Sequence, residues 1–243
     1  MGSISYFVGN VMPYITLVVF LVGFIYRVAV WWSRPSPISI AVFPGQRSVG
    51  QAIVRVLTDV IFFRSLLRFK GNYTLWLGSW IFHLSFLVLI LSHLRYFIGS
   101  VAVPGWINAI QELGIIAGIV ISVPLIYLIL RRVVNEDIRF ISTPADYFIV
   151  LLILAVAITG LFTKFIDHPN IVGVKYMIMN LMAFKPVLPE GINSAFILHF
   201  FLAQVLIMYL PFSKVMHLGG IFFSPTRTHI FGGEAHTKEI PEE

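Results

Sequence analysis

Five long apolar runs constrain this chain more than any other feature of its sequence. Each has about 17 residues or more, close to the length that a helix needs to cross a membrane. Backbone groups in lipid must be hydrogen-bonded within their own segment, and the runs lack the alternation of a barrel strand, so we expect helices. The runs span residues 13–32, 76–98, 113–130, 147–163 and 191–213.

The composition supports a membrane protein. Only 12% of the 243 residues are charged, whereas soluble domains have about 25%. We therefore predict an all-α integral membrane protein, a five-transmembrane-helix bundle, with residues 1–225 as a single membrane domain and 226–243 as a tail. We expect the first run to stay as a helix rather than to be cleaved as a signal peptide, because no basic residue precedes it.

The positive charges predict the orientation in the membrane. By the positive-inside rule, the connections after the first and third runs are cytoplasmic, the N-terminus is outside and the C-terminus is cytoplasmic. The cell inner (cytoplasmic) membrane is the expected location, and the net charge of +6 belongs to loops rather than to a nucleic-acid-binding surface. The two basic connections carry Arg34, Arg47, Arg55, Arg64, Arg68 and Lys70 and, farther along, Arg131, Arg132 and Arg139.

Residues 49–69, in the first basic connection, predict an interfacial helix that lies on the membrane surface. Apolar residues recur there at helical spacing, with charged residues between them. Such a helix could only anchor the loop, or it could also be a docking surface for a cytoplasmic subunit; the two roles are compatible. Farther along, Thr143 and Pro144 predict the start of the fourth helix, with Asp146 in its first turn.

Four histidines lie in or beside the second and fifth runs. An imidazole is costly to bury in an apolar span, so each requires a partner or a function. His83 and His93 are ten residues apart, about 15 Å along a helix, and point to roughly the same side. His199 and His217 are eighteen apart, which is five full turns of one helix. Because the second and fifth helices run in opposite directions, we expect His83 to face His217 and His93 to face His199.

Two imidazoles facing each other in an apolar interior most often bind haem, so these four histidines are the predicted metal ligands of two haems b. Zinc would need four ligands at one point. The absence of cysteine excludes covalently attached haem and cysteine-ligated clusters within the chain. Arg95 and Lys214 could pair with haem propionates, or could simply extend to the membrane surface. Helix–helix hydrogen bonding is the alternative role for the four histidines, and His168, His229 and His236 are expected to be solvated.

Two segments carry a resemblance to a known family. The segments GNYTLWLGSWIFHLSFLVLILSHLRYFIG and HFFLAQVLIMYLPFSKVMH resemble the cytochrome b (gamma) subunit of respiratory nitrate reductase. The wider family includes membrane cytochromes of heterodisulfide-reductase-like and dissimilatory sulfur-metabolism complexes. The resemblance covers about residues 10–225. It implies two haems b on helices two and five, quinone chemistry at the outer haem, and a cytoplasmic iron–sulfur partner subunit at the inner one.

One departure from the family pattern concerns the quinone. In nitrate reductase gamma subunits a lysine before helix three is linked to quinone binding, whereas the corresponding segment here, GWINAIQELG, has none. Its polar groups are Asn108, Gln111 and Glu112, and we take Gln111 and Glu112 as candidates for a menaquinone or ubiquinone site. This departure favours the sulfur-metabolism relatives over a nitrate reductase gamma subunit proper. The alternatives outside this family are a haem-free histidine-relay proton channel or transporter and a purely structural anchor.

Overall fold

The computed structural model describes residues 2–33, 48–68, 71–98 and 104–220, so the predicted tail 226–243 lies outside the described residues. This part of the chain is helical and contains no strand. Five of its helical segments are long and apolar enough to cross a membrane, which confirms the predicted five-helix architecture. They span Ser3–Ser33, Tyr73–Tyr96, Gly105–Val134, Pro144–Asp167 and Ser194–Phe212.

Short turns and small helices extend or connect these spans. The first span joins α1, a π-helical turn and α2, and the other spans are built on α4, α5, α7 and α9. The elements are α1 (Ser3–Tyr6), α2 (Met12–Ser33), α3 (Val49–Phe62), α4 (Tyr73–His93), α5 (Gly105–Val134), α6 (Glu136–Ile141), α7 (Pro144–Phe162), α8 (Ile171–Met182), α9 (Ser194–Tyr209) and α10 (His217–Gly220).

The predicted spans of 13–32, 76–98, 113–130 and 147–163 begin later than the observed helices. For the fourth span the reason is that apolarity does not mark the polar first turn of a helix. The start of α7 shows the reason. Thr143 and Asp146 form a capping box there, in which the Thr143 backbone N–H donates to Asp146 Oδ2 at 2.9 Å. The helix therefore begins at Pro144, three residues before its apolar run.

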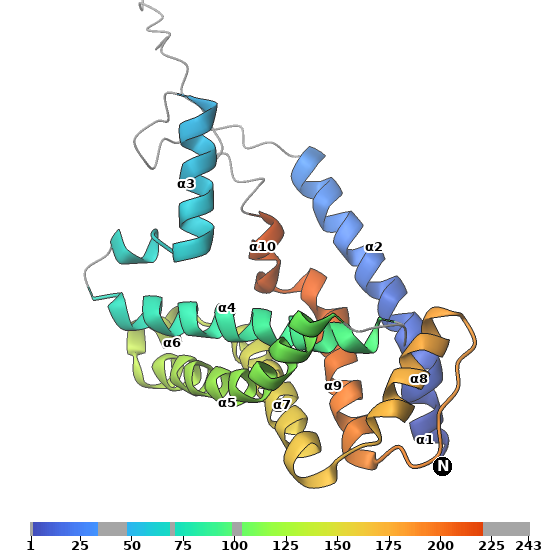
Figure 1. Cartoon of the computed structure of the whole chain (residues 1–243). Coiled ribbons are helices and arrows are strands. Elements are labelled where there is room, and N and C mark those ends of the chain that lie inside the picture. The colour runs from blue at the N-terminus through green and yellow to red at the C-terminus, as the bar shows by residue number, and fades with distance from the viewer. Residues whose placement is uncertain (1, 34–47, 69–70, 99–103, 221–243) are drawn as a thin grey trace, which may run out of the picture.

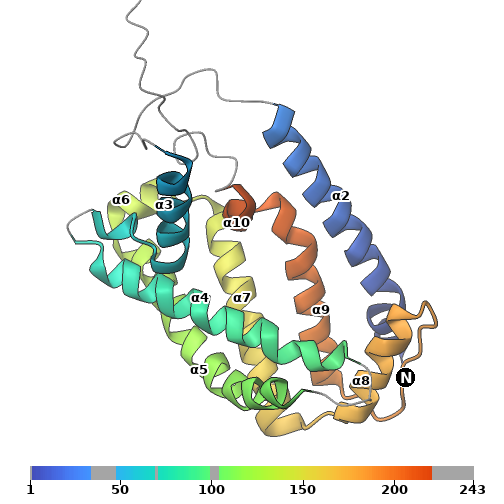
Figure 2. The same ribbon diagram turned by 45° about the horizontal axis from the view of Figure 1, so that its top comes forward.

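The spans pack in the order α4, α5, α7, α9 and α2. Figures 1 and 2 show α4 and α5 side by side, with α7 and α9 following and α2 at the far edge. One of two buried clusters lies between α5, α7 and α9 and includes Ile121, Leu125, Ile149, Ile153 and Leu206. This packing lets side chains of α4 reach α9 across the bundle.

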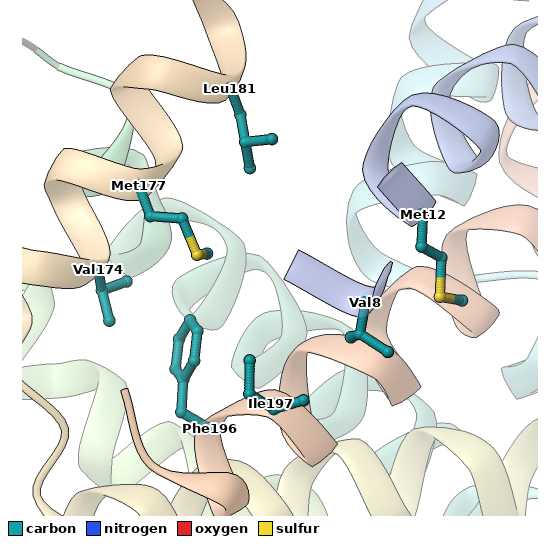
Figure 3. Packing of buried hydrophobic residues seen from close by; sticks show 7 residues of the cluster. All are labelled: Val8, Met12, Val174, Met177, Leu181, Phe196 and Ile197. Atoms are coloured by element: carbon teal, nitrogen blue, oxygen red, sulfur yellow. The ribbon is translucent and has the colours of Figure 1, made fainter. Parts of the chain in front are cut away.

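Helix α8 closes one end of the bundle. Its buried residues Val174, Met177 and Leu181 pack against the start of the first span and the start of α9. Figure 3 shows Met177 pointing toward Phe196, with Val8 on the facing segment. The first and fifth spans are thus fixed to each other at the end where the chain begins.

The predicted interfacial helix 49–69 is shorter than expected. Helix α3 ends at Phe62, because Phe63 adopts a left-handed conformation with φ of 47°. The indole N–H groups of Trp76 and Trp80, on α4, donate to the last carbonyl oxygens of α3 at 2.7 and 3.2 Å. Figure 1 shows α3 projecting from the bundle near the start of α4. Its position on a membrane surface stays a prediction.

The fifth helix is interrupted, and the prediction of five continuous turns from His199 to His217 is wrong. Pro211 cannot donate a helical hydrogen bond, and Ser213 is extended, with φ of −104° and ψ of 167°. Arg27 Nε, on α2, donates to the Pro211 carbonyl at 3.0 Å. Regular α-helix therefore stops at Tyr209, and His217 begins the separate helix α10.

Candidate functional site: two facing histidine pairs

The four histidines of the apolar spans come together as two pairs. The ring centroids of His83 and His217 are 5.9 Å apart, with an interplanar angle of 78°. Those of His93 and His199 are 6.4 Å apart, with an angle of 27°. We call these the His83 pair and the His93 pair. They are the pairs expected from antiparallel helices, although the second member of the His83 pair lies beyond the break in the fifth helix.

The His83 pair is oriented by backbone carbonyls of its own segments. His83 Nδ1 lies 2.7 Å from the Ser79 carbonyl oxygen, one turn earlier on α4. His217 Nδ1 lies 3.0 Å from the Lys214 carbonyl oxygen. The ring of Phe63, just beyond α3, packs 4.7 Å from the His83 ring, centroid to centroid. Helix α3 thus ends in direct contact with this pair.

The His93 pair depends in part on a neighbouring helix. His93 Nδ1 lies 2.6 Å from the Leu89 carbonyl oxygen, but His199 Nδ1 lies 3.1 Å from Thr159 Oγ1, on α7. The Thr159 hydroxyl donates to the Ala155 carbonyl at 2.7 Å, so its oxygen accepts from His199. At the adjacent Gly160, an added Cβ would lie 3.0 Å from His199 Cε1. Glycine therefore allows α7 to approach the imidazole closely.

These contacts fix which nitrogen of each ring carries the proton. Carbonyl oxygens only accept hydrogen bonds, and the Thr159 hydrogen is already donated, so Nδ1 is protonated in all four rings. Each neutral ring then has its lone pair on Nε2, as in metal-bound histidines whose other nitrogen donates a hydrogen bond. This arrangement gives each pair two potential metal ligands.

The separations within the pairs match one metal ion per pair. Two metal–nitrogen bonds of about 2 Å each, together with half of each ring, place imidazole centroids about 6 Å apart. Within the described residues, no three His, Cys, Asp or Glu side chains come together as a metal-binding group. The geometry of this part of the chain thus fits a two-ligand ion in a macrocycle better than a four-ligand zinc ion.

The two predicted propionate partners lie in different surroundings. Lys214 Nζ is 2.8 Å from Asp146 Oδ2, so this cation already has a carboxylate partner in the protein. Arg95 lies over the ring of its neighbour Tyr96, with the guanidinium carbon 6.0 Å from the ring centroid. A propionate role therefore stays a prediction for both.

The candidate quinone residues lie in the first turns of α5. Asn108 and Glu112 are exposed, and Gln111 is partly buried. Downstream on the same helix, Gly114 packs so closely on Ser92 that an added Cβ would lie 2.9 Å from its side chain. Because Ser92 precedes His93, the polar start of α5 lies at the His93 end of α4.

The structure adds contributors that the sequence reasoning missed. Thr159 and Gly160 interrupt an apolar run. A small polar residue beside a glycine in such a run indicates that another helix approaches closely there. Asp146 was noted only as a helix-start residue, and Phe63 had no distinguishing signal. His168, which is exposed, caps the last turn of the fourth span with φ of 41° and lies outside both pairs. His229 and His236 lie outside the described residues.

Comparison with known proteins identifies the family. Residues 65–228, which include both pairs, match the family described as nitrate reductase gamma subunit. A protein of Archaeoglobus fulgidus named Hdr-like menaquinol oxidoreductase cytochrome b-like subunit is 32% identical, over 90% of this chain and 78% of its own length. Its namesake in Archaeoglobus profundus is 31% identical over 89% and 76%. The chain therefore belongs to the nitrate reductase gamma subunit family of cytochrome b-like membrane proteins.

Proposed function

We propose that this chain is the membrane di-haem cytochrome b subunit of a respiratory oxidoreductase complex. In this role it passes electrons between the membrane quinol pool and a cytoplasmic iron–sulfur partner subunit. The observation that carries the proposal is that four imidazoles, each with an acceptor for Nδ1–H, lie as two pairs with ring centroids 5.9 and 6.4 Å apart, which leaves Nε2 of each ring available as a ligand. The names of the two relatives support menaquinol as the quinol.

Each residue pair has a defined part in this proposal. His83 and His217 hold one haem b, and His93 and His199 hold the other. Haem iron with two imidazole ligands supplies one-electron chemistry. The ring of Phe82 packs edge-on against His83, with centroids 5.0 Å apart, and contributes an apolar contact at this pair.

The quinol site is proposed at the His93 end, beside the start of α5. Glu112 is exposed there and can accept a proton from the quinol hydroxyl, while the amide of Gln111 can orient the quinone oxygen. The missing lysine in this segment keeps the chain with the sulfur-metabolism relatives in our proposal. A site at this end would separate quinol chemistry from the His83 pair.

The charge distribution supports the proposed orientation in the membrane. The His83 end adjoins the basic connections, since Phe63, in the first of them, packs against His83 and the Arg132 carbonyl accepts from Tyr147 at the start of α7. By the positive-inside rule this end is cytoplasmic, which puts the N-terminus outside. The protein then lies in the cell inner membrane, and its iron–sulfur partner docks near the His83 pair.

The test is a reduced-minus-oxidised spectrum with haem quantitation on protein purified in detergent. We expect two haems b per chain, at least one of which is reduced by the soluble menaquinol analogue menadiol. A ubiquinol analogue, tested in parallel, reports the preferred quinone class. Protein that is folded and freshly extracted but contains no haem would overturn the proposal, and a histidine proton relay would then be the better explanation.

A further inference from the structure

His217 occupies an unusual place for a residue of a membrane site. It begins α10, a helix of four residues, after the extended residue Ser213 has ended the fifth span. Its side chain is exposed, whereas its partner His83 lies partly buried within the long helix α4. The fifth span alone therefore does not determine where the His217 ring points.

Lys214 links His217 to the rest of the bundle. Its carbonyl oxygen accepts the hydrogen bond from His217 Nδ1 at 3.0 Å, and its ammonium group lies 2.8 Å from Asp146 Oδ2. One residue thus orients the imidazole through its backbone and is held by α7 through its side chain. Ser213 Oγ supports the same turn by accepting from the Val215 backbone N–H at 3.2 Å.

Asp146 is a rigid anchor for this link. Its side chain is only 9% exposed, against 73% for the Lys214 side chain. The same Oδ2 atom also accepts from the Thr143 backbone N–H and from Thr143 Oγ1, both at 2.9 Å. The capping box therefore fixes the carboxylate, and the carboxylate fixes the flexible lysine. Capping alone does not require a charge, because neutral Asn and Gln oxygens also accept such bonds.

We propose that Asp146 is a positioning residue for His217. Through its ion pair with Lys214, the first turn of α7 holds the α10 segment so that the imidazole faces His83. This inference rests on the proposed function, because the ring it positions is a proposed haem ligand. It assigns Lys214 to a protein carboxylate instead of a haem propionate.

The experiment compares Asp146→Asn and Lys214→Met in purified protein. Asn keeps an oxygen for the capping box but loses the charge, and Lys214→Met alters a mostly exposed side chain without touching the cap. The readout is the low-spin haem signal that is lost in His217→Ala. Electron paramagnetic resonance and redox titration monitor this signal in each variant. We expect the haem affinity of that site to fall about 10-fold in both variants, as for loss of groups that orient metal ligands. The signal of the His93 pair stays unchanged.

Two controls separate positioning from other effects. Asp137→Asn removes an exposed acid from the first turn of α6, and we expect no change. Thr143→Ala removes the hydroxyl bond to Asp146 Oδ2 but keeps the backbone N–H bond to the same oxygen and the ion pair, and we expect the His217-dependent signal to persist. The Asp146→Asn/Lys214→Met double variant should be no worse than either single variant, because both break the same link.

Several outcomes would overturn the inference. One is an unchanged His217-dependent signal in both single variants, when the wild type holds two haems. Another is an equal loss in Thr143→Ala, which would make the role of Asp146 a capping role only. Shifts of the midpoint potential in opposite directions, with an unchanged resonance line shape, would show an effect of charge without positioning. Absence of haem from the wild type would instead refute the proposed function itself.

Discussion

His199 is oriented by a neighbouring helix, whereas His83 and His217 are oriented by carbonyls of their own segments. In the His93 pair, Thr159 of α7 accepts from His199, and Gly160 lets the two helices approach. In the His83 pair, the acceptors are the Ser79 and Lys214 carbonyls. The same protonation state is therefore reached at His199 by helix packing and at the other three imidazoles by local backbone geometry.

The two pairs should consequently differ in what disturbs them. The His93 pair needs the α7–α9 interface, which includes part of the buried cluster between α5, α7 and α9. The His83 pair needs the segment after Pro211 to stay in place, and it also contacts Phe63 at the end of α3. A change at a helix interface should affect the His93 pair first, and a change near α3 or α10 should affect the His83 pair first.

Removal of one histidine from each pair is expected to have the largest effect. His199→Ala should abolish one of two haems and the reduction by quinol, and His217→Ala should abolish the other haem, because a single imidazole cannot supply both ligands. Haem quantitation and difference spectra measure both. His168→Ala, at an exposed histidine outside the pairs, is the control and should keep two haems. A His199 variant that retains both haems would contradict the pairing.

Loss of the Thr159 hydroxyl, which accepts the hydrogen bond from His199, should have an intermediate effect. Thr159→Val keeps the shape of the side chain but leaves His199 Nδ1–H without its acceptor. We expect haem affinity at the His93 pair to fall about 10-fold, and the His83 pair to be unaffected. Haem titration of the depleted protein tests this. Ser122→Ala is a matched control, because its hydroxyl bonds only within α5, to the Gly118 carbonyl. Equal losses in both variants would rule out a specific role for Thr159.

The smallest expected effect is at the contact between α3 and His83. Phe63→Leu removes an aromatic ring contact worth about 1 kcal/mol, so haem at the His83 pair should dissociate a few-fold faster. Transfer of haem to apomyoglobin measures the rate. Phe62→Leu, at the exposed neighbouring position, should change nothing. If the His93 pair responded to Phe63→Leu instead, the division between the two pairs would be incorrect.

Much of this architecture could be predicted from the sequence because it depends on local chemistry. Length and apolarity predicted five spans, and opposite helix directions predicted which histidines face each other. The break at Pro211 was readable in principle, yet the eighteen-residue spacing from His199 to His217 suggested a continuous helix. The expected pairing of His83 with His217 thus agrees with the structure, although the expected continuous helix from His199 to His217 does not.

By itself, the sequence determined that the chain forms apolar helices and which of the four imidazoles in or beside them face each other. Only the tertiary structure decided how those imidazoles are held. Thr159 lies 40 residues from His199, and Asp146 lies 68 residues from Lys214. Contacts of this kind depend on which helix faces pack together. Packing is set by the fit of whole surfaces, and no pattern along one helix specifies it.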